Sequence, residues 1–427
     1  MIAQELRTNE RPARARTSRA LVVTLGGVAL LALVRIVTGT DDLTSAGTFG
    51  TAVRLTVPIL LAGLGGLYAE RCGIVNIGLE GMMILGTWFA AYGGVEWGAW
   101  QGVALGIVGG ALGGLLHAVA TVTFGVDHVI SGVAINILGA GAARYLSVIT
   151  WVGEGGGGGA TQSPRVTGSV GQLDLPVLAG GDLLGWQTPD ALGRLASWHW
   201  FVVSDVAGLL RALTGDLSLL TVIAFVLVPT SAWFLWRTPL GLRLRSAGES
   251  PHAAESLGVD VYRVKYVGTV LSGAMAGLAG AFLVIEATHI YRQGQTGGRG
   301  FLGLASLIFG NWRPSGVALG SGLFGFADGV ANRPDAEELV HALLLFVALA
   351  ALAAAVWLFA RRRLAAAGVL VTVAALAAMW YAGSDTVPRQ LLGITPHITT
   401  LLVLAFATQR LRPPAADGVP YRRGEAT

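Results

Sequence analysis

Long apolar runs recur along most of the chain and are separated by short polar segments. Each run has roughly 18 to 25 residues, which lets a helix cross a hydrocarbon core about 30 Å thick. So many runs predict an all-α fold, a polytopic membrane helical bundle of about 10–11 spans. We expect the spans at 21–37, 50–69, 81–98, 100–124, 129–150, 217–236, 264–287, 301–330 (broken at 313–314), 339–360, 365–383 and 393–410.

The composition agrees with a membrane protein. Of the 427 residues, 53% are hydrophobic and 13% are charged, where a soluble domain carries about 25% charged residues. A basic segment, 1–20, precedes the first run, as in a signal peptide. That run is long for a signal, and no small-residue cleavage site follows it, so we expect a helix that is retained.

Basic residues are distributed unevenly between the predicted spans. If the N-terminus is cytoplasmic, most Lys and Arg residues fall in cytoplasmic segments, as the positive-inside rule requires. The interpretation is a multi-pass protein of the cell inner or plasma membrane, with both termini cytoplasmic. The net charge of +4 then reflects topology, and no nucleic-acid partner is expected.

The two halves have a similar plan. Glycine-rich interruptions near 73–81 and 294–303 fall in corresponding places and face opposite sides in this topology, which predicts inverted repeats with broken helices around a transport pathway. The predicted division is a basic N-terminal segment 1–20, a first helical repeat 21–150, an external Gly-rich loop 151–216, a second helical repeat 217–410 with a coupling loop 238–262 and a two-helix insertion 339–383, and a cytoplasmic tail 411–427.

The external segment begins with the glycine run 155–159 and later holds Trp198, His199 and Trp200. A flexible run followed by amphipathic aromatic pieces predicts a lid that lies on the membrane face.

The run 70–83 places Asn76 and Glu80 among glycines at the mouth of an apolar helix. Buried polar groups there are costly unless they are paired or wet. Either they line a solute cavity and shape the helix break, or Glu80 caps a first turn while Asn76 satisfies backbone groups.

A second polar cluster extends from Asp127 to Asn136 and includes Ser131. Asp127 and His128 stand at a helix start, which favours capping. Asn136 lies about two turns further on, where it either bonds a neighbouring helix or faces the pore.

The third cluster, 294–301, is rich in glycine, which permits close helix approach. Its Arg299 either anchors at the interface or pairs with Glu286.

The largest basic cytoplasmic loop contains Pro251, suited to a first helical turn, and Gly258 just past a helix end. We predict a helix of about two turns there. The alternative is an ordinary amphipathic connector.

Several chemistries have no support. There is no G-x-x-x-x-G-K-[ST] phosphate loop, no H-E-x-x-H motif and no G-x-S-x-G motif, so we expect a transport subunit without its own ATPase site, catalytic residue, metal or cofactor. Cys72 is the only cysteine, which excludes an intrachain disulfide and a thiolate cluster.

The runs 76–83, 131–136, 238–243 with 248–249, 298–301 and the tail 413–422 together resemble a known family. The chain is similar to permease subunits of bacterial ABC importers of the branched-chain amino acid, simple sugar and nucleoside group, and most similar to nucleoside-type permeases. The segments 151–215 and 335–390 are longer than in that family's pattern.

The resemblance implies an ATP-driven ABC importer, in which an ABC ATPase subunit hydrolyses ATP for the permease. It also implies a second homologous permease in a heterodimer and an extracytoplasmic solute-binding lipoprotein. Nucleosides lead as cargo, followed by simple sugars and branched-chain amino acids. The alternatives are an ion-coupled secondary transporter that titrates Glu80 or Asp328, and a structural scaffold. We expect the substrate pathway at Asn76, Glu80, Ser131, Asn136 and Arg299, and ATPase coupling at Glu249, Ala253, Ala254 and Gly258.

Overall fold

The computed structural model describes residues 13–153, 157–173, 179–183, 186–215, 217–406 and 411–423. Parts of the predicted N-terminal segment, of the glycine run, of the last span and of the tail lie outside these residues. The α-helices are α2 (Ala13–Thr38), α3 (Ala46–Arg71), α4 (Leu79–Glu96), α5 (Ala99–Ala118), α6 (His128–Trp151), α7 (Ala191–Ser197), α8 (Val203–Ala212), α9 (Leu219–Arg237), α10 (Pro239–Glu249), α11 (Pro251–Ser256), α12 (Val261–Phe282), α13 (Arg299–Phe309), α14 (Pro314–Ala331), α15 (Ala336–Ala360), α16 (Leu364–Gly383), α17 (Arg389–Leu392) and α18 (Thr395–Phe406).

The remaining elements are short. A 3-10 turn, η2 (Asp41–Thr44), precedes α3, while the π-helical turns η3 (Val119–Thr123) and η4 (Leu283–Thr288) extend α5 and α12. Two antiparallel pairs join β1 (Gln172–Leu173) with β4 (Leu217–Ser218) and β2 (Ala179–Leu183) with β3 (Trp186–Asp190). The described part is an all-α bundle, as the sequence predicts.

Seven helices of the described residues are long and apolar enough to span a membrane. They are Ala46–Arg71, Ala99–Thr123, His128–Trp151, Leu219–Arg237, Val261–Thr288, Ala336–Ala360 and Leu364–Gly383. The predicted span 301–330 is two helices, α13 and α14, and the break comes at Pro314, as expected from a residue that cannot continue a helix.

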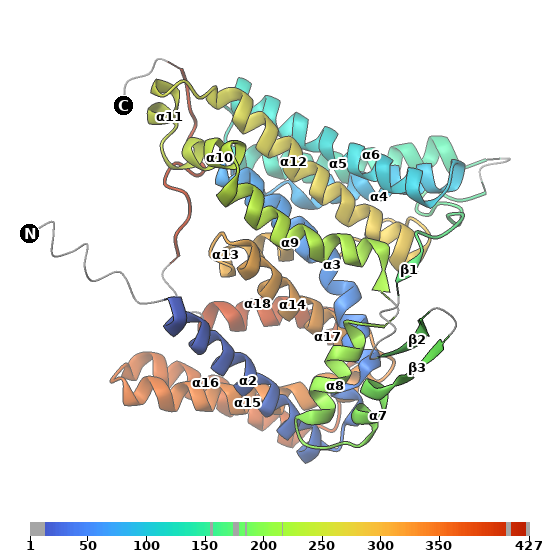
Figure 1. Cartoon of the computed structure of the whole chain (residues 1–427), viewed down its shortest axis with the longest axis vertical. Helices are drawn as coiled ribbons and strands as arrows, with labels where there is room; N and C mark the ends of the chain where they lie inside the picture. Colours follow the sequence, from blue (N-terminus) through green and yellow to red (C-terminus); the bar gives the residue numbers. More distant parts are fainter. Residues whose placement is uncertain are drawn as a thin grey trace, which may run out of the picture. The chain divides into compact units, whose positions relative to one another are not determined.

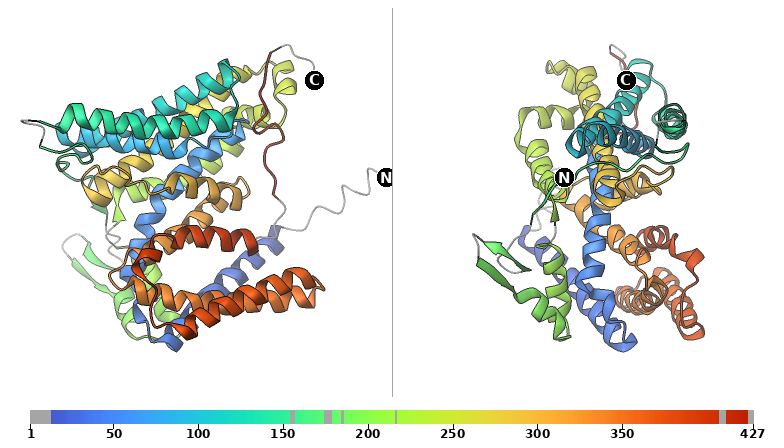
Figure 2. Two further views of the ribbon diagram at one scale, coloured as in Figure 1. Left: turned by 180° about the vertical axis from the view of Figure 1, so that it is seen from behind. Right: turned by 90° about the vertical axis from the view of Figure 1, so that its right-hand side faces the viewer.

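The chain forms two compact units. Unit 1 comprises residues 1–51, 174–215 and 330–395, and unit 2 comprises residues 52–173, 216–329 and 396–427. Each unit is assembled from three separate stretches of sequence, which is visible in the colours of Figure 2.

Unit 2 is built around α4, α5 and α12, which pack directly on one another (Figure 1). Glycines form much of this interface: a Cβ on Gly110 of α5 would lie 2.2 Å from the carbonyl oxygen of Gly273 on α12. Because lipid tails are as apolar as the side chains, close backbone packing through small residues replaces the hydrophobic drive between such helices.

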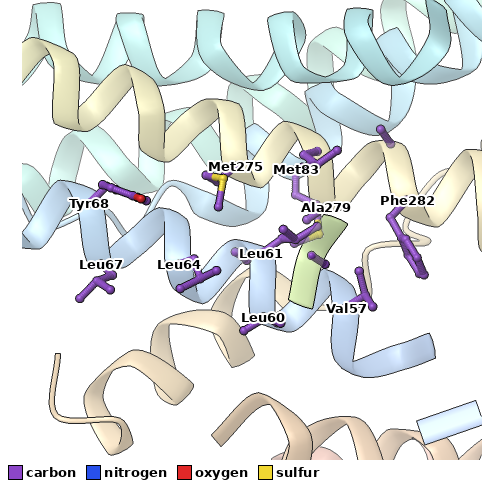
Figure 3. Packing of buried hydrophobic residues seen from close by; sticks show 14 of the residues in the cluster. Val57, Leu60, Leu61, Leu64, Leu67, Tyr68, Met83, Met275, Ala279 and Phe282 are labelled. Atoms are coloured by element: carbon purple, nitrogen blue, oxygen red, sulfur yellow. The ribbon is translucent and has the colours of Figure 1, made fainter. Parts of the chain in front are cut away.

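The core of unit 2 surrounds α3. Leu60, Leu61 and Leu64 lie fully buried beside Met275 of α12 and Met83 of α4 (Figure 3). The stretch of α3 from Val57 to Ala69 is buried throughout and apolar on every side, as expected of an enclosed helix.

Unit 1 contains the hairpin of α15 and α16, with α2 packed on α15. A buried ion pair joins α2 to α8, with 3.3 Å between Arg35 Nε and Asp205 Oδ1, and the Thr44 hydroxyl donates to the same carboxylate. Trp198 and Trp200 remain more than half exposed and contact each other, with ring centroids 4.9 Å apart. The described residues between 179 and 215 therefore form a β-hairpin and two short helices, of which α8 is tied to α2, and the lid stays a prediction.

Candidate functional site

The start of α4 has no side-chain cap of its own, because Gly78 occupies the cap position. Asn76, which is fully buried in the turn before α4, organises the start of this helix instead. Its Oδ1 accepts from Gly78 N at 3.1 Å, and its Nδ2 donates to Ser272 Oγ of α12 at 2.9 Å. Asn76 therefore satisfies the backbone, as one interpretation expected, and also fastens the break to α12.

Asn136 of α6 binds the same turn through its side-chain amide. Its Oδ1 accepts from Gly81 N at 2.7 Å, and its Nδ2 donates to the Ile77 carbonyl at 3.0 Å. Of the two interpretations, the bond to a neighbouring element is the one that the structure shows. It supplies a partner to one of the orphan N–H groups at the α4 N-terminus.

Ser131 belongs to a neighbouring chain of hydrogen bonds. Its Oγ lies 2.8 Å from His117 Nδ1, and His117 Nε2 lies 3.1 Å from the Val75 carbonyl. His128 Nδ1 accepts from Val75 N at 3.3 Å. His117 and His128 thus hold the backbone of the break by hydrogen bonds to Val75. Sequence reasoning missed this role because each side chain bonds a residue outside its own helix.

Capping at the start of α6 was predicted for both Asp127 and His128. The Asp127 carboxylate accepts from Val129 N at 2.9 Å and Ile130 N at 3.0 Å, which confirms its part. The prediction is wrong for His128, whose ring faces the break.

Glu80 lies on the first turn of α4, but its carboxylate caps a different helix. Oε1 accepts from Gly298 N at 3.0 Å, and Oε2 accepts from Gly300 N at 2.7 Å, so Glu80 closes the N-terminus of α13. A carboxylate there satisfies two orphan donors and opposes the positive end of the helix dipole. The two glycine-rich interruptions of the sequence therefore meet at this residue.

Their approach depends on Gly300. A Cβ at this position would lie 2.6 Å from both the Cα and the N of Glu80, closer than real Cβ contacts allow. Only glycine brings the two backbones within reach of the carboxylate.

Arg299 pairs with Asp328 of α14. Its Nε lies 2.9 Å and its terminal nitrogen 2.5 Å from Asp328 Oδ2, with both side chains largely buried. The predicted pair with Glu286 is wrong, and an anchor at the membrane interface stays a prediction. The guanidinium lies beside the opposite charge that follows on the next helix.

The five predicted pathway residues therefore form a band of hydrogen bonds around the two breaks. Its donors and acceptors are amides, hydroxyls, imidazoles, backbone groups and the Glu80 carboxylate, and Arg299 is paired with Asp328. Burial raises the pKa of the nearby Cys72 thiol to about 12, so this thiol stays protonated and is a poor nucleophile. Within the described residues no His, Cys, Asp and Glu cluster is arranged to hold a metal. The band suits recognition of an uncharged polar solute.

A second candidate surface lies at α10 and α11. The Thr238 hydroxyl accepts from Gly241 N at 3.1 Å and so caps α10, a helix that the sequence did not predict. The predicted short helix is α11, beginning at Pro251 and ending before Gly258. Both segments begin with a proline at the first turn, where its missing N–H is harmless.

The residues predicted for coupling differ in exposure. Ala253 and Gly258 are exposed, whereas Ala254 is buried against the chain itself. Glu249 is half exposed, lies 3.8 Å from an Arg71 nitrogen, and accepts from Ala415 N at 3.2 Å.

Leu257, which sequence reasoning passed over, is 85% exposed at the end of α11. A large apolar side chain that is this exposed on a short surface helix indicates a contact surface. The signal was available, since Leu257 is the only large apolar residue between Pro251 and Gly258.

Residues 48–349 match the sequence profile of the family described as the permease component of branched-chain amino acid transport systems. The chain belongs to this family. The permease is therefore a transport component and, with its seven long apolar helices, a multi-pass membrane protein.

Three curated relatives resemble the permease. The guanosine ABC transporter permease protein NupQ of Bacillus subtilis is 30% identical over 377 residues, covering 86% of this chain and 94% of the relative. The putative glucose ABC transporter permease protein TsgC13 of Haloferax volcanii is 31% identical, covering 69% and 80%. A second guanosine ABC transporter permease protein of the same Bacillus strain, NupP, is 26% identical, covering 70% and 80%. No solved structure matches the permease.

Proposed function

We propose that this permease is the membrane-spanning subunit of an ATP-driven ABC importer of nucleosides. The observation that carries the proposal is the junction at Glu80, where a carboxylate from one helix break closes the N-terminus of the other. Broken helices that meet at a polar junction are typical of solute paths through a bundle. Asn76, Ser131, Asn136 and Arg299 complete the junction.

Transport proceeds by alternating access. Rocking of the helices that carry Glu80 against those that carry Gly298 and Gly300 exposes the junction first outside and then inside. The solute exchanges hydrogen bonds with the amides and hydroxyls around it, and Arg299 and Asp328 neutralise each other, while the Glu80 carboxylate is held by backbone N–H groups of α13.

The driving force comes from a partner ABC ATPase, since the sequence contains no phosphate loop. The ATPase engages α10 and α11, with Leu257 inserted in a groove and Glu249, Ala253 and Gly258 around it. Both termini are cytoplasmic. Outside, a solute-binding lipoprotein delivers the cargo.

A second permease completes the pathway as a heterodimer. In support, NupQ and NupP are two guanosine ABC transporter permease proteins from one Bacillus strain, and both resemble this chain.

Nucleosides are the leading cargo because two relatives are named for guanosine. Simple sugars are the second candidate, since TsgC13 is named as a putative glucose permease at similar identity. Each is an uncharged solute rich in hydroxyls, which fits the polar band.

An ion-coupled secondary transporter needs a carboxylate that can bind and release an ion. The Glu80 carboxylate accepts hydrogen bonds from the backbone of α13, and the Asp328 carboxylate pairs with Arg299. Both carboxylates that could bind an ion therefore already have partners within the chain. This observation favours the ATP-driven mechanism.

The test is uptake by the complex purified through a tag on this chain and placed in proteoliposomes. Expected is ATP-dependent uptake of labelled guanosine that unlabelled nucleosides suppress and glucose or leucine do not. Uptake driven by an ion gradient without ATP would overturn the proposal, and competition by glucose would move the cargo to sugars.

A further inference from the structure

The C-terminal tail, residues 411–423, follows a defined path along α10 and α11. Ala416 N donates to the carbonyl of Gly248, the penultimate residue of α10, at 2.8 Å. Ala415 N donates to the Glu249 carboxylate at 3.2 Å, and Arg412 N donates to Asn311 Oδ1 at 2.8 Å. The tail thus connects the turn before α14 with the end of α10 by backbone hydrogen bonds.

Further along the chain, the tail contacts α11 itself. The Tyr421 hydroxyl and Arg423 Nε both donate to the Glu255 carboxylate, the latter at 2.5 Å. These two donors lower the pKa of Glu255 and so keep it charged. The Tyr421 ring, almost fully buried, meets the His252 ring edge-on with centroids 5.0 Å apart.

Between these contacts the tail reaches into the chain. The carboxyl of Asp417 hydrogen-bonds that of Glu70 on α3 and lies near Lys265 of α12 and Arg71. Lys265 is the only lysine of the sequence and is 1% exposed, with its Nζ 5.9 Å from the centroid of the Tyr421 ring. A buried ammonium is costly without a counter-charge, and the Tyr421 ring and the hydrogen-bonded carboxyl pair of Asp417 and Glu70, which carries one negative charge when it shares one proton, compensate the charge of Lys265.

The tail, the end of α10, α12 and the helix break before α4 meet at Gly73, which lies in this break. A Cβ on this residue would lie 3.1 Å from the Ala416 carbonyl, 3.3 Å from Gly248 Cα and 3.5 Å from Lys265 Nζ. The tail, the end of α10, α12 and the helix break are therefore in direct contact.

The helix α11 needs such support. It has six residues, and Ser250 at its start makes no side-chain cap. A helix of this length is unstable by itself, since nucleation costs more than its few hydrogen bonds return. Its orientation is set by what it touches.

We propose that residues 411–423 form a strap whose Tyr421, Arg423 and Asp417 position α11 against the helix break before α4, so that movement of α11 by the ATPase reaches the pathway. This inference rests on the proposed function for the identity of the moving partner. The three residues are positioning residues: none of them touches the solute.

The test compares Tyr421→Phe/Arg423→Met with wild type in the purified complex in proteoliposomes. The double change removes both donors to Glu255 and leaves the ring of residue 421 in place. Arg412→Gln is the matched control, because it removes a tail charge whose described contact is made by the backbone. Expected is an uptake rate that falls about tenfold, the factor that corresponds to about one hydrogen bond to a charged group. ATP hydrolysis and the amount of bound ATPase stay within twofold of wild type.

Hydrogen exchange of the permease alone in nanodiscs gives a second readout. Amides of 251–258 exchange about tenfold faster in the double variant, and Arg423→Lys, which retains a donor, restores most of the protection. Unchanged uptake and exchange in the double variant would overturn the strap. So would a loss of folded protein in proportion to the loss of uptake, which identifies a merely structural role. If wild type shows no ATP-driven uptake, the proposed function fails while the exchange comparison still decides the strap.

Discussion

Two short helices of this permease, α13 and α11, both begin without a side-chain cap of their own, and the chain holds them by different means. The α13 N-terminus is closed by Glu80, which is 8% exposed and accepts from two backbone N–H groups. On α11, Glu255 is held by Tyr421 and by Arg423, whose side chain is 63% exposed. Buried charge-assisted bonds fix a junction, whereas contacts at the surface allow a helix to yield to a partner.

This contrast predicts that changes at α13 lower the free energy of unfolding and that changes at α11 chiefly affect coupling. Four experiments test it, ordered by their expected effect on the free energy of unfolding.

Gly300→Ala has the largest expected effect. The new Cβ would lie 2.6 Å from the Glu80 backbone, and forcing α13 away costs about 3 kcal/mol. Thermal unfolding in detergent measures the loss. Gly322→Ala on α14 is the matched control, since nothing lies within 4 Å of its Cβ, and it should be neutral or stabilising. Equal stability of the two variants would contradict the close approach.

Glu80→Gln comes next. The amide retains one acceptor but turns an N–H toward a backbone donor, so one bond to a charged group, about 2 kcal/mol, is lost. Guanosine uptake should fall with it, because the junction opens. Glu96→Gln, an exposed change at the other end of α4, should leave unfolding and uptake unchanged. A stable Glu80→Gln variant that transports normally would reduce Glu80 to a dispensable cap.

The third prediction concerns pH at the strap. Burial raises the pKa of Asp417 from 3.8 to about 7, against the opposing effects of its bond to Glu70 and of Lys265 and Arg71. The folded state binds the proton more tightly than the unfolded state, so this contribution to stability is complete below pH 4 and is lost as pH rises toward 7. The protection factors of amides in 413–421, which are exchange rates corrected for the intrinsic pH dependence of unprotected amides, should therefore be higher at pH 5.5 than at pH 8, one value below and one above the folded pKa.

Asp417→Asn is the control for this experiment. Its side chain cannot titrate, so the difference in protection factor between the two pH values should disappear. A difference that persists would assign it to another group, such as Glu70, whose carboxyl is hydrogen-bonded to that of Asp417.

Leu257→Asp should have the smallest effect on the fold, within about 0.5 kcal/mol of wild type, because the side chain is exposed. Its effect on the ATPase should be large, since it places a charge where an apolar contact is proposed. Capture of the ATPase on the tagged permease measures this, and Leu257→Met should retain it. Full capture by the aspartate variant would remove Leu257 from the coupling surface.

Much of the fold was predictable because it follows from local chemistry. Apolar runs gave the long helices, Pro314 gave the break between α13 and α14, and Pro251 with Gly258 gave α11. The Asp127 cap needs only the backbone of the next turn, so its bond to Ile130 N was predictable as well.

The partners of the polar groups were not predictable. Glu80 and Gly300 are 220 positions apart, Arg423 and Glu255 are 168 apart, and Asn76 bonds Ser272 on a helix that local patterns do not connect with it. Hydropathy identifies which residues are costly to bury and leaves open which distant group compensates each one.

The sequence by itself determined an all-α membrane bundle, the places where its helices break, and the short helix at Pro251–Ser256. Each depends on neighbours within a few turns, where backbone hydrogen bonding and apolar length decide the outcome. Only the tertiary structure decided that Glu80 closes α13, that Arg299 faces Asp328 and that the tail lies on α11. These are contacts between remote segments, and which segments meet depends on how the whole bundle packs.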